Sequence, residues 1–348
     1  MDGESTEPLQ ISLFFFSADG TSVAEGKYDL ILQAAQLADE MGLTAIWTPE
    51  RHFGQFGGLY PNPAVLGAAI AARTRRIGIR AGSVVLPLHH PVRVVEEWSV
   101  VDNLSGGRVA LAMATGWNRT AFVLNPAAYA DRHQRLETDI GLIRRLWAGE
   151  SASFPGVDGA HVDLSTYPRP IQKVLPLWLT ASSPEAWQRA AQFDANVLCR
   201  LGPSITQLAA HVSAYREARA RNGYDAADGI VTVMVHAYVH PDIDEAKSAV
   251  RAPMMDYLKE HLALRMSDAG GGPELKITQR AQEFLEAGFE QRFRDSLIGP
   301  QPKCRALLQQ LQKAGANEVA CLVDFGLCQE AVLGGVVRLG QLRASLSA

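Results

Sequence analysis

Short runs rich in β-branched and aromatic residues alternate with amphipathic stretches along nearly the whole sequence. The strand candidates are residues 11–16, 45–48, 77–86, 108–114, 177–180, 196–199, 232–239 and 318–323. Stretches with helical periodicity lie between them, at residues 28–41, 64–73, 91–104, 131–147, 184–193, 205–222 and 302–314. Parallel strands need helical crossovers between them. Eight strands separated in this way therefore predict a (β/α)8 TIM barrel of the α/β class.

The alternative to a barrel is an open, doubly wound sheet. A dinucleotide-binding sheet of that kind carries a G-x-G-x-x-G motif after its first strand, whereas residues 17–20 read Ser-Ala-Asp-Gly. The strands are apolar on both faces, as expected where a core fills one side and helices cover the other. Barrels reach 348 residues as one unit, so we expect one domain over residues 9–345 behind a flexible tail of residues 1–8.

Two stretches interrupt the repeat. Residues 151–174 are rich in glycine and proline and predict an excursion with a short hairpin before the fifth strand. Residues 251–298 form a long insertion between the seventh and eighth strands, with Gly270, Gly271 and Gly272 near its centre. Long insertions on barrels often act as lids, and a disordered surface loop is the other interpretation of this segment.

The composition argues against several classes of function. The formal net charge is −4 and the basic residues are scattered, whereas binding to nucleic acid needs a concentrated basic face. The four cysteines form no C-x-x-C pair, so a disulfide framework or zinc site is not expected and a reducing cytosol is favoured. The start of the chain is acidic, and no apolar run of about 18 residues occurs. We therefore expect a soluble cytoplasmic protein.

The chemistry of a barrel enzyme lies just after the carboxyl ends of its strands. After the second strand come Glu50, Arg51 and His52, a carboxylate, a guanidinium and an imidazole in succession. Histidine exchanges protons near neutral pH and a carboxylate can fix its tautomer, so this segment is a candidate acid/base cluster. A plain loop with a surface salt bridge would have the same sequence.

The third and fourth strands, like the fifth, carry small or polar residues near their carboxyl ends. Gly82 and Ser83 lie within the third strand, where small residues allow a planar ligand to approach the backbone. The fourth strand leads into Thr115, Gly116, Trp117 and Asn118, whose amides could receive a phosphate or a ligand carbonyl.

After the fifth strand, Ala181, Ser182 and Ser183 precede Pro184. This pattern is typical of a capped helix start that suits a phosphate monoester, and an ordinary cap has the same pattern. His89 and His90 follow the third strand, but no helical H-x-x-x-H or carboxylate spacing accompanies them, so a metal site is not expected.

Together these segments resemble the bacterial luciferase-like monooxygenases, and in particular the branch found in natural-product gene clusters. The resemblance extends from about residue 9 to residue 325. It is carried by residues 47–53 (WTPERHF), 85–87 with 90–93, 102 with 105–108, 116–118 and 318–326.

The resemblance implies reduced FMN (FMNH2) at the carboxyl-end mouth of the barrel, with O2 as co-substrate and a flavin C4a-peroxide. Gly82-Ser83 matches a non-prolyl cis peptide beside the flavin ring. Thr115, Gly116 and Trp117 match cofactor contacts, and Ala181, Ser182 and Ser183 match the phosphate cradle. We expect Phe16, His90 and Asn118 to line the substrate pocket, and Glu50, Arg51 and His52 to be catalytic.

Two positions depart from the pattern of bacterial luciferase. Arg51 occupies the place of the first of two histidines, and Ala114 replaces a reactive cysteine. Light emission is therefore not expected, whereas oxygenation remains plausible. Arg51 could stabilise a peroxide anion or hold an acidic substrate by charge-assisted hydrogen bonds.

The leading hypothesis is a monooxygenase that acts on a small metabolite or a carrier-protein-bound intermediate in secondary metabolism. Because no dinucleotide motif is present, we expect a separate flavin reductase to supply the reduced cofactor. The alternatives are a deazaflavin F420-dependent hydride-transfer oxidoreductase and a non-catalytic flavin-binding protein. We also expect a homodimer that pairs through the helices at residues 64–73 and 91–104, and no binding to nucleic acid or membrane.

Overall fold

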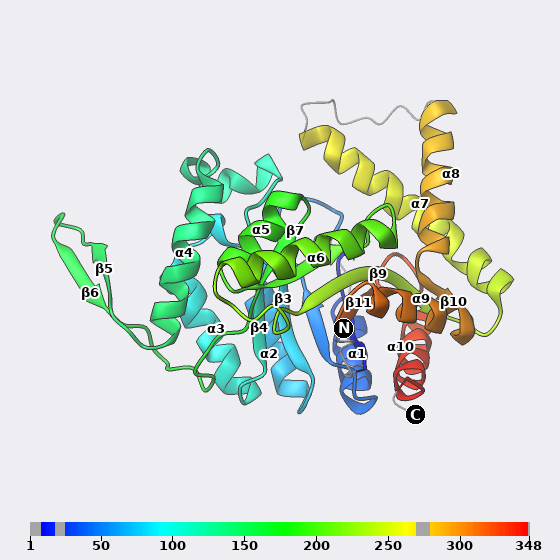
Figure 1. Ribbon diagram of the computed structural model, residues 1–348, viewed down its shortest axis with the longest axis horizontal. Coiled ribbons are helices and arrows are strands. Elements are labelled where there is room, and N and C mark those ends of the chain that lie inside the picture. The colour runs from blue at the N-terminus through cyan, green and yellow to red at the C-terminus, as the bar shows by residue number, and fades with distance from the viewer. Residues whose placement is uncertain (1–7, 18–24, 269–278, 347–348) are drawn as a thin grey trace.

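A computed structural model describes residues 8–17, 25–268 and 279–346 (Figure 1). The expected tail falls almost entirely outside the described residues, and so do Gly270, Gly271 and Gly272.

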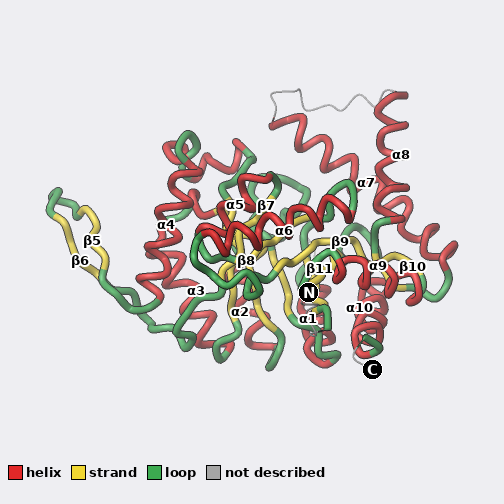
Figure 2. The backbone as a smooth tube through the Cα atoms, in the orientation of Figure 1, coloured by secondary structure: helices red, strands yellow, loops and turns green. Residues whose placement is uncertain are grey.

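Eight parallel strands form a closed barrel, which confirms the predicted (β/α)8 fold. They are β1 (Gln10–Phe14), β2 (Ala45–Thr48), β3 (Gly78–Val85), β4 (Val109–Ala114), β7 (Leu177–Ala181), β8 (Asn196–Arg200), β9 (Val231–Val239) and β11 (Glu318–Leu322). Strand β1 pairs with both β2 and β11, and the pairing of β8 with β9 closes the ring. Each predicted strand is present, with ends that differ by one or two residues. Figure 2 shows the strands gathered inside a layer of helices.

Eight helices cover the barrel. They are α1 (Asp29–Glu40), α2 (Pro63–Arg73), α3 (Pro91–Ser105), α4 (Arg132–Trp147), α5 (Pro184–Gln192), α6 (Ile205–Arg221), α9 (Gln301–Lys313) and α10 (Gln329–Ala344). Side-chain caps begin α2, α3, α5 and α6. At the start of α2, for example, Asn62 accepts hydrogen bonds from two backbone amides of the first turn. The last helix, α10, was not predicted. Within the described ranges, no helix has both the length and the apolar composition that a membrane crossing needs.

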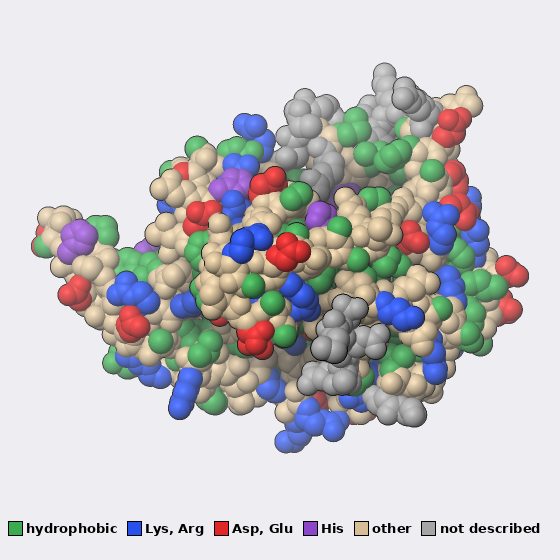
Figure 3. Space-filling model, in the orientation of Figure 1, with side chains coloured by type: hydrophobic (Ala, Val, Ile, Leu, Met, Phe, Trp, Pro, Cys, Tyr) green, Lys and Arg blue, Asp and Glu red, His purple; other side chains and the backbone are tan. Residues whose placement is uncertain are grey.

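The excursion before the fifth barrel strand contains an antiparallel hairpin, as predicted. Strand β5 (Ala152–Pro155) pairs with β6 (His161–Leu164), and the hairpin projects from the barrel as an arm (Figures 1 and 3). On the face shown in Figure 3, basic and acidic side chains are interspersed rather than gathered by sign.

The second insertion is helical, so the interpretation as a disordered loop was wrong for its described residues. It begins at Ile243, earlier than predicted, and comprises α7 (Ile243–Asp268), α8 (Gln279–Arg294) and the short strand β10 (Leu297–Gly299), which pairs with β9. The two helices share a hydrophobic cluster of their own, in which Val250, Met254 and Phe289 are buried. Pro253 lies inside α7 and obscures its helical pattern in the sequence.

The inside of the barrel contains a buried ion pair, whereas the sequence pattern predicted apolar residues throughout. Arg80 Nη1 on β3 donates to Glu318 Oε2 on β11 at 2.6 Å. The guanidinium lies 4.9 Å from the ring centroid of Trp47 and 4.8 Å from that of Trp178. The indole of Trp47 also donates to Glu318 Oε1 at 3.0 Å. These four side chains fill the lower part of the barrel and leave its carboxyl end for a site.

We propose that the protein forms a homodimer through α2 and α3, which carry exposed apolar side chains. We therefore predict that the Leu104→Glu variant is a monomer. Leu104 is 56% exposed, and Val65 and Val100 are exposed nearby on these helices. A buried carboxylate at a subunit interface is costly. Light scattering at micromolar concentration measures the change. Val123→Glu, at an exposed position on another segment, is the control and leaves the dimer intact. A monomeric wild-type protein would refute the prediction.

Candidate functional site

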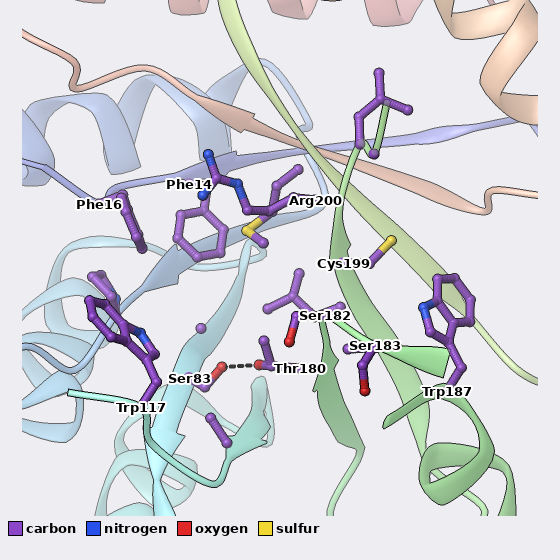
Figure 4. Close-up of a pocket in the computed structure, with 18 of the residues that line it drawn as sticks. Phe14, Phe16, Ser83, Trp117, Thr180, Ser182, Ser183, Trp187, Cys199 and Arg200 are labelled. Atoms are coloured by element: carbon purple, nitrogen blue, oxygen red, sulfur yellow. Dashed lines mark hydrogen bonds between the residues drawn. The ribbon is translucent and has the colours of Figure 1, made fainter. Parts of the chain in front are cut away.

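A cavity of about 530 Å³ opens at the carboxyl end of the barrel (Figure 4). This volume lies in the range of about 300–1,000 Å³ that small-molecule sites occupy. Residues at or just after the carboxyl ends of nearly all the barrel strands line this cavity. The lining residues named in the sequence analysis are Phe16, Glu50, Arg51, Gly82, Ser83, Ala114, Gly116, Trp117, Ala181, Ser182, Ser183 and Pro184.

Gly82 stands where the barrel has no room for a side chain. A Cβ atom at this position would lie 2.7 Å from Cε2 of Phe14 and 3.1 Å from the Trp47 ring. The peptide bond between Gly82 and Ser83 is cis, as the resemblance implies. The Ser83 hydroxyl is hydrogen-bonded to the Thr180 hydroxyl on β7, the next strand but one in the barrel (Figure 4). The wall formed by Gly82, Ser83 and Thr180 is therefore narrow and polar.

The start of α5 forms another part of the cavity wall. Ser183 is the N-cap of the helix, and its hydroxyl accepts a hydrogen bond from the Ala186 amide at 3.4 Å. Pro184 follows at the first helical position. Ser183 is thus an ordinary cap and also a cavity residue. The positive end of a helix dipole and a hydroxyl-bearing turn together favour an anion at this place.

The Glu50 carboxylate is the centre of a buried hydrogen-bond cluster beside the cavity. Its side chain is 0% exposed, and its Oε1 lies 2.7 Å from His52 Nε2 and 2.6 Å from His89 Nε2. The Val85 amide donates to its Oε2 at 2.7 Å. Burial acts to raise the pKa of Glu50, but the hydrogen bonds from both histidines and the amide outweigh it and hold the pKa below its usual value.

An ionised Glu50 determines the tautomers of both histidines. A carboxylate can only accept hydrogen bonds, so each Nε2 must carry a proton. The Nδ1 atom of each ring is then the one left to exchange a proton. Burial lowers the pKa of His89, but the hydrogen bond and the negative charge of Glu50 raise it overall.

Arg51 contacts aromatic rings rather than Glu50. Its guanidinium carbon lies 4.5 Å from the ring centroid of Phe16 and 4.8 Å from that of Phe56, and Nε donates to the Phe56 carbonyl at 3.3 Å. The Glu50 carboxylate is therefore paired with His52 and not with the neighbouring Arg51. Arg51 and Phe16 both line the cavity, so its upper rim has a fixed positive charge.

Four of the expected site residues do not line the cavity. His52 lies behind Glu50, and Thr115 is absent from the wall although Gly116 and Trp117 belong to it. His90 caps α3 through Nδ1, and its ring centroid lies 5.3 Å from that of Phe154 on the hairpin arm. Asn118 caps a short 3-10 helix (Arg119–Leu124). The expectation that His90 and Asn118 line the substrate pocket was wrong, because local capping fixes both side chains elsewhere.

The segment of residues 102 and 105–108, which is one of those that carry the family resemblance, has a structural role. Asp102 accepts from the amides of Ile171 and Gln172, at 2.6 and 3.0 Å, and holds the loop that follows the hairpin arm. Arg108 donates to the carbonyls of Ser105 and Ile77 and joins the end of α3 to the strands. These residues position the barrel wall and do not touch the cavity.

The structure brings residues to the site that the sequence analysis did not select. His89 shares the Glu50 oxygen, and its position directly after the third strand was the available signal. Cys199, Arg200 and His261 line the cavity. Burial raises the pKa of Cys199 to about 12, so this thiol is protonated and is not a nucleophile. Within the part of the chain that the structure describes, no group of three or more His, Cys, Asp or Glu residues is placed to hold a metal ion.

The luciferase-like monooxygenase family model matches residues 9–318 of the 348-residue chain. The chain is 32% identical over 180 residues to the oxygenase component of a flavin-dependent trigonelline monooxygenase from Acinetobacter baylyi. That match covers 49% of this chain and 48% of the relative, so it spans about half of the relative's length.

Longer matches include both a monooxygenase and an F420-dependent dehydrogenase. The 4-hydroxyprotoasukamycin monooxygenase of Streptomyces nodosus subsp. asukaensis is 28% identical over 303 residues, which are 84% of this chain and 79% of the relative. An F420-dependent glucose-6-phosphate dehydrogenase of Microbacterium testaceum is 28% identical over 268 residues, which are 73% of this chain and 79% of the relative.

A solved structure has the same fold. It is the oxygenating constituent of 3,6-diketocamphane monooxygenase from Pseudomonas putida, a type II Baeyer-Villiger monooxygenase in complex with FMN. The TM-score is 0.78 at 17% sequence identity, over 97% of this chain and 98% of that chain.

We predict that Glu50→Gln lowers the pKa of His89 below that of an ordinary histidine. The charge that raises this pKa is removed, while the burial that lowers it remains. In the wild type the raised pKa of His89 contributes stability that is complete at low pH and is lost as the pH rises through that pKa. This contribution disappears in the variant. A histidine titration by NMR measures the shift.

His133 on α4 is the internal control for this titration. Burial and the charge of Arg132 lower its pKa, and neither depends on Glu50. An unchanged His89 titration in Glu50→Gln would show that the carboxylate does not govern the pair.

Proposed function

The chain belongs to the luciferase-like monooxygenase family, and on this basis we propose that it is a flavin-dependent monooxygenase. It binds reduced FMN in the cavity at the barrel mouth and uses O2 to oxidise a small organic substrate. The observation that carries the proposal is that one cavity combines a narrow wall at Gly82 and Ser83, aromatic walls and a hydroxyl-bearing helix start.

The residues of the cavity suit both halves of FMN. Ser182, Ser183 and the amides at the start of α5 would hold the phosphate, where hydrogen-bond donors and the helix dipole favour negative charge. The flat ring system would lie against Gly82 and Ser83, and Trp117 would provide an aromatic wall (Figure 4). These are residues of the chain that match the family's cofactor contacts.

Reduced flavin supplies the electrons that activate O2 when it is bound. The chain's own contribution is proton handling and charge. His52 and His89, held by Glu50, would accept or donate a proton at Nδ1. Arg51 would provide fixed positive charge at the rim, and the aromatic walls would exclude water.

The partners are part of the same proposal. A separate flavin reductase would supply the reduced cofactor, since the chain has no dinucleotide-binding motif after its first strand. The substrate would be a small metabolite or a carrier-protein-bound intermediate of natural-product biosynthesis. The 28% identity with a Streptomyces monooxygenase of that kind supports this assignment.

Anaerobic reduction of the FMN-loaded protein, followed by rapid mixing with O2, tests the proposal. We expect the bound flavin to be reoxidised at a rate that differs from that of free reduced FMN. Anaerobic turnover with reduced F420 and no reaction with O2 would instead favour the hydride-transfer oxidoreductase, a function that one relative has. Ordered flavin that consumes no O2 would identify a non-catalytic binding protein.

We predict that the Ser182→Ala/Ser183→Ala variant binds FMN more weakly and riboflavin with unchanged affinity. Hydrogen bonds to a charged group contribute about 1.5–3 kcal/mol each, so FMN affinity should fall at least about tenfold. Fluorescence titration with both flavins measures the difference. Asn62→Ala removes the cap of α2, a residue that does not line the cavity, and controls for the lost Ser183 cap. Equal FMN affinity in the variant and the wild type would exclude this cradle.

We predict that His52→Ala slows the reaction of the bound reduced flavin with O2 but leaves FMN binding intact. A general acid or base contributes about 10²–10⁴ in rate, and His52 does not line the cavity that holds the cofactor. Stopped-flow rates per bound FMN measure the effect, with His133→Ala as a control. If His52 only packs against Phe53, where the ring centroids are 5.7 Å apart, stability falls and the rate stays at the wild-type value.

A further inference from the structure

Positive side chains gather over one side of the cavity, between the end of β8 and the helices of the second insertion. Arg200 is the last residue of β8, and its Nη1 lies 3.4 Å from Nε2 of His261 on α7. Arg200 and His261 both line the cavity. Arg292 on α8 is near enough that, after burial, the charge of Arg200 is the next cause that lowers its pKa. Arg200 and His261 thus meet in the cavity wall, and Arg292, which does not itself line the cavity, adds positive charge near Arg200.

In the part of the chain that the structure describes, the two arginines of this group have no acidic partner. Among the described residues, neither Arg200 nor Arg292 forms an ion pair with Asp or Glu, whereas Arg80, Arg189 and Arg219 each do. Arg292 Nη1 donates to the Gly288 carbonyl of its own helix at 3.3 Å. Two acids of α8, Glu286 and Glu290, pair with Arg251 and Lys247 of α7 instead. Arg200 is exposed to solvent, whereas Arg292 is partly buried, and a partly buried guanidinium without a counter-charge is costly unless an anion joins it.

Two buried polar atoms beside the same group also lack partners. Nε2 of His236 and the hydroxyl of Tyr257 have no hydrogen-bond partner within the described ranges. The two side chains are 6% and 4% exposed, and their ring centroids lie 5.0 Å apart. Burial and the charges of Arg292 and Arg200 hold the pKa of His236 well below its usual value. Its ring is therefore neutral and offers an unused polar nitrogen, which is the feature expected of a binding site that is empty.

This basic group lies away from the helix start that suits the FMN phosphate. In Figure 4 the Arg200 side chain extends across the cavity toward Phe14 and Phe16. Ser183 and Trp187 lie at the right of the view, on the side away from those two rings. Arg51 lies against Phe16, so it adds positive charge on the side toward which Arg200 points. The cavity therefore presents two regions that favour anions.

We propose that the substrate of this enzyme carries an acidic group, a carboxylate or a sulfonate, which binds between Arg200 and Arg292 beneath α7. The inference rests on the proposed function, because it assigns the second anion-binding region to the substrate. The remainder of the substrate lies against Phe14 and Phe16. A carboxylate in this position supplies the missing counter-charge for both guanidinium groups.

Binding of matched acids and amides tests this assignment without any turnover. Benzoate and octanoate are titrated into the FMN-loaded protein, and benzamide and octanamide serve as the uncharged counterparts. We expect at least one acid to bind more tightly than its amide. In Arg200→Gln and in Arg292→Gln the affinity for that acid should fall at least about tenfold, while affinity for the amide is unchanged. Arg294→Gln, an exposed position on the same helix, is the matched control and leaves acid binding intact.

Three results would overturn the proposal. The first is that neither acid binds more tightly than its amide. The second is that Arg200→Gln weakens FMN but not riboflavin, which would assign Arg200 to the cofactor phosphate. The third is unchanged acid affinity with a lower melting temperature in both variants, which would give the arginines a structural role. Since binding needs neither O2 nor reduced flavin, a protein that fails to oxygenate but retains this pattern refutes the proposed function alone.

Discussion

The ion pair between Arg80 and Glu318 inside the barrel is the interaction on which the site depends. It joins β3 to β11, and the rings of Trp47 and Trp178 enclose the guanidinium from β2 and β7. Removing one partner of a buried pair costs about 3–5 kcal/mol, because the other charge stays buried. These large side chains fill the lower barrel, and the level above is occupied by smaller residues such as Gly82. The cavity therefore lies directly above these large side chains, where residues with small side chains leave space.

Much of the fold was predictable, because strand and helix periodicities are local properties of the sequence. The eight barrel strands and the hairpin before the fifth strand were confirmed. The helices α7 and α8 were not recognised, since Pro253 and a glycine-rich stretch between them are typical of a loop. Strand β10 has three residues and forms only because β9 provides a pairing edge, a contact that a local pattern does not contain.

The site was predictable in its location but not in its contacts. Strand ends identified Glu50, Gly82 and Ser182, because a parallel barrel brings all its carboxyl ends together. The hydrogen bond from His89 to Glu50 joins residues 39 positions apart, and it depends on the backbone turn after β3. His90 and Asn118 failed as pocket residues because a nearby helix end offered each a closer partner. Sequence position gave the level of a residue in the barrel, and only the tertiary structure gave the direction of its side chain.

The hydrophobic cluster beneath α7 and α8 is separate from the main core of the barrel and smaller than it. Residues such as Val250, Met254 and Phe289 bury their surface against each other and against the barrel rim, not within the main core. Regions with a small core of their own can open at a free energy below that of global unfolding. Amide protons of the helix pair should therefore exchange with solvent sooner than those of the barrel strands. The helix pair, whose residue His261 lines the cavity, is in this sense a cooperative unit with a local stability of its own.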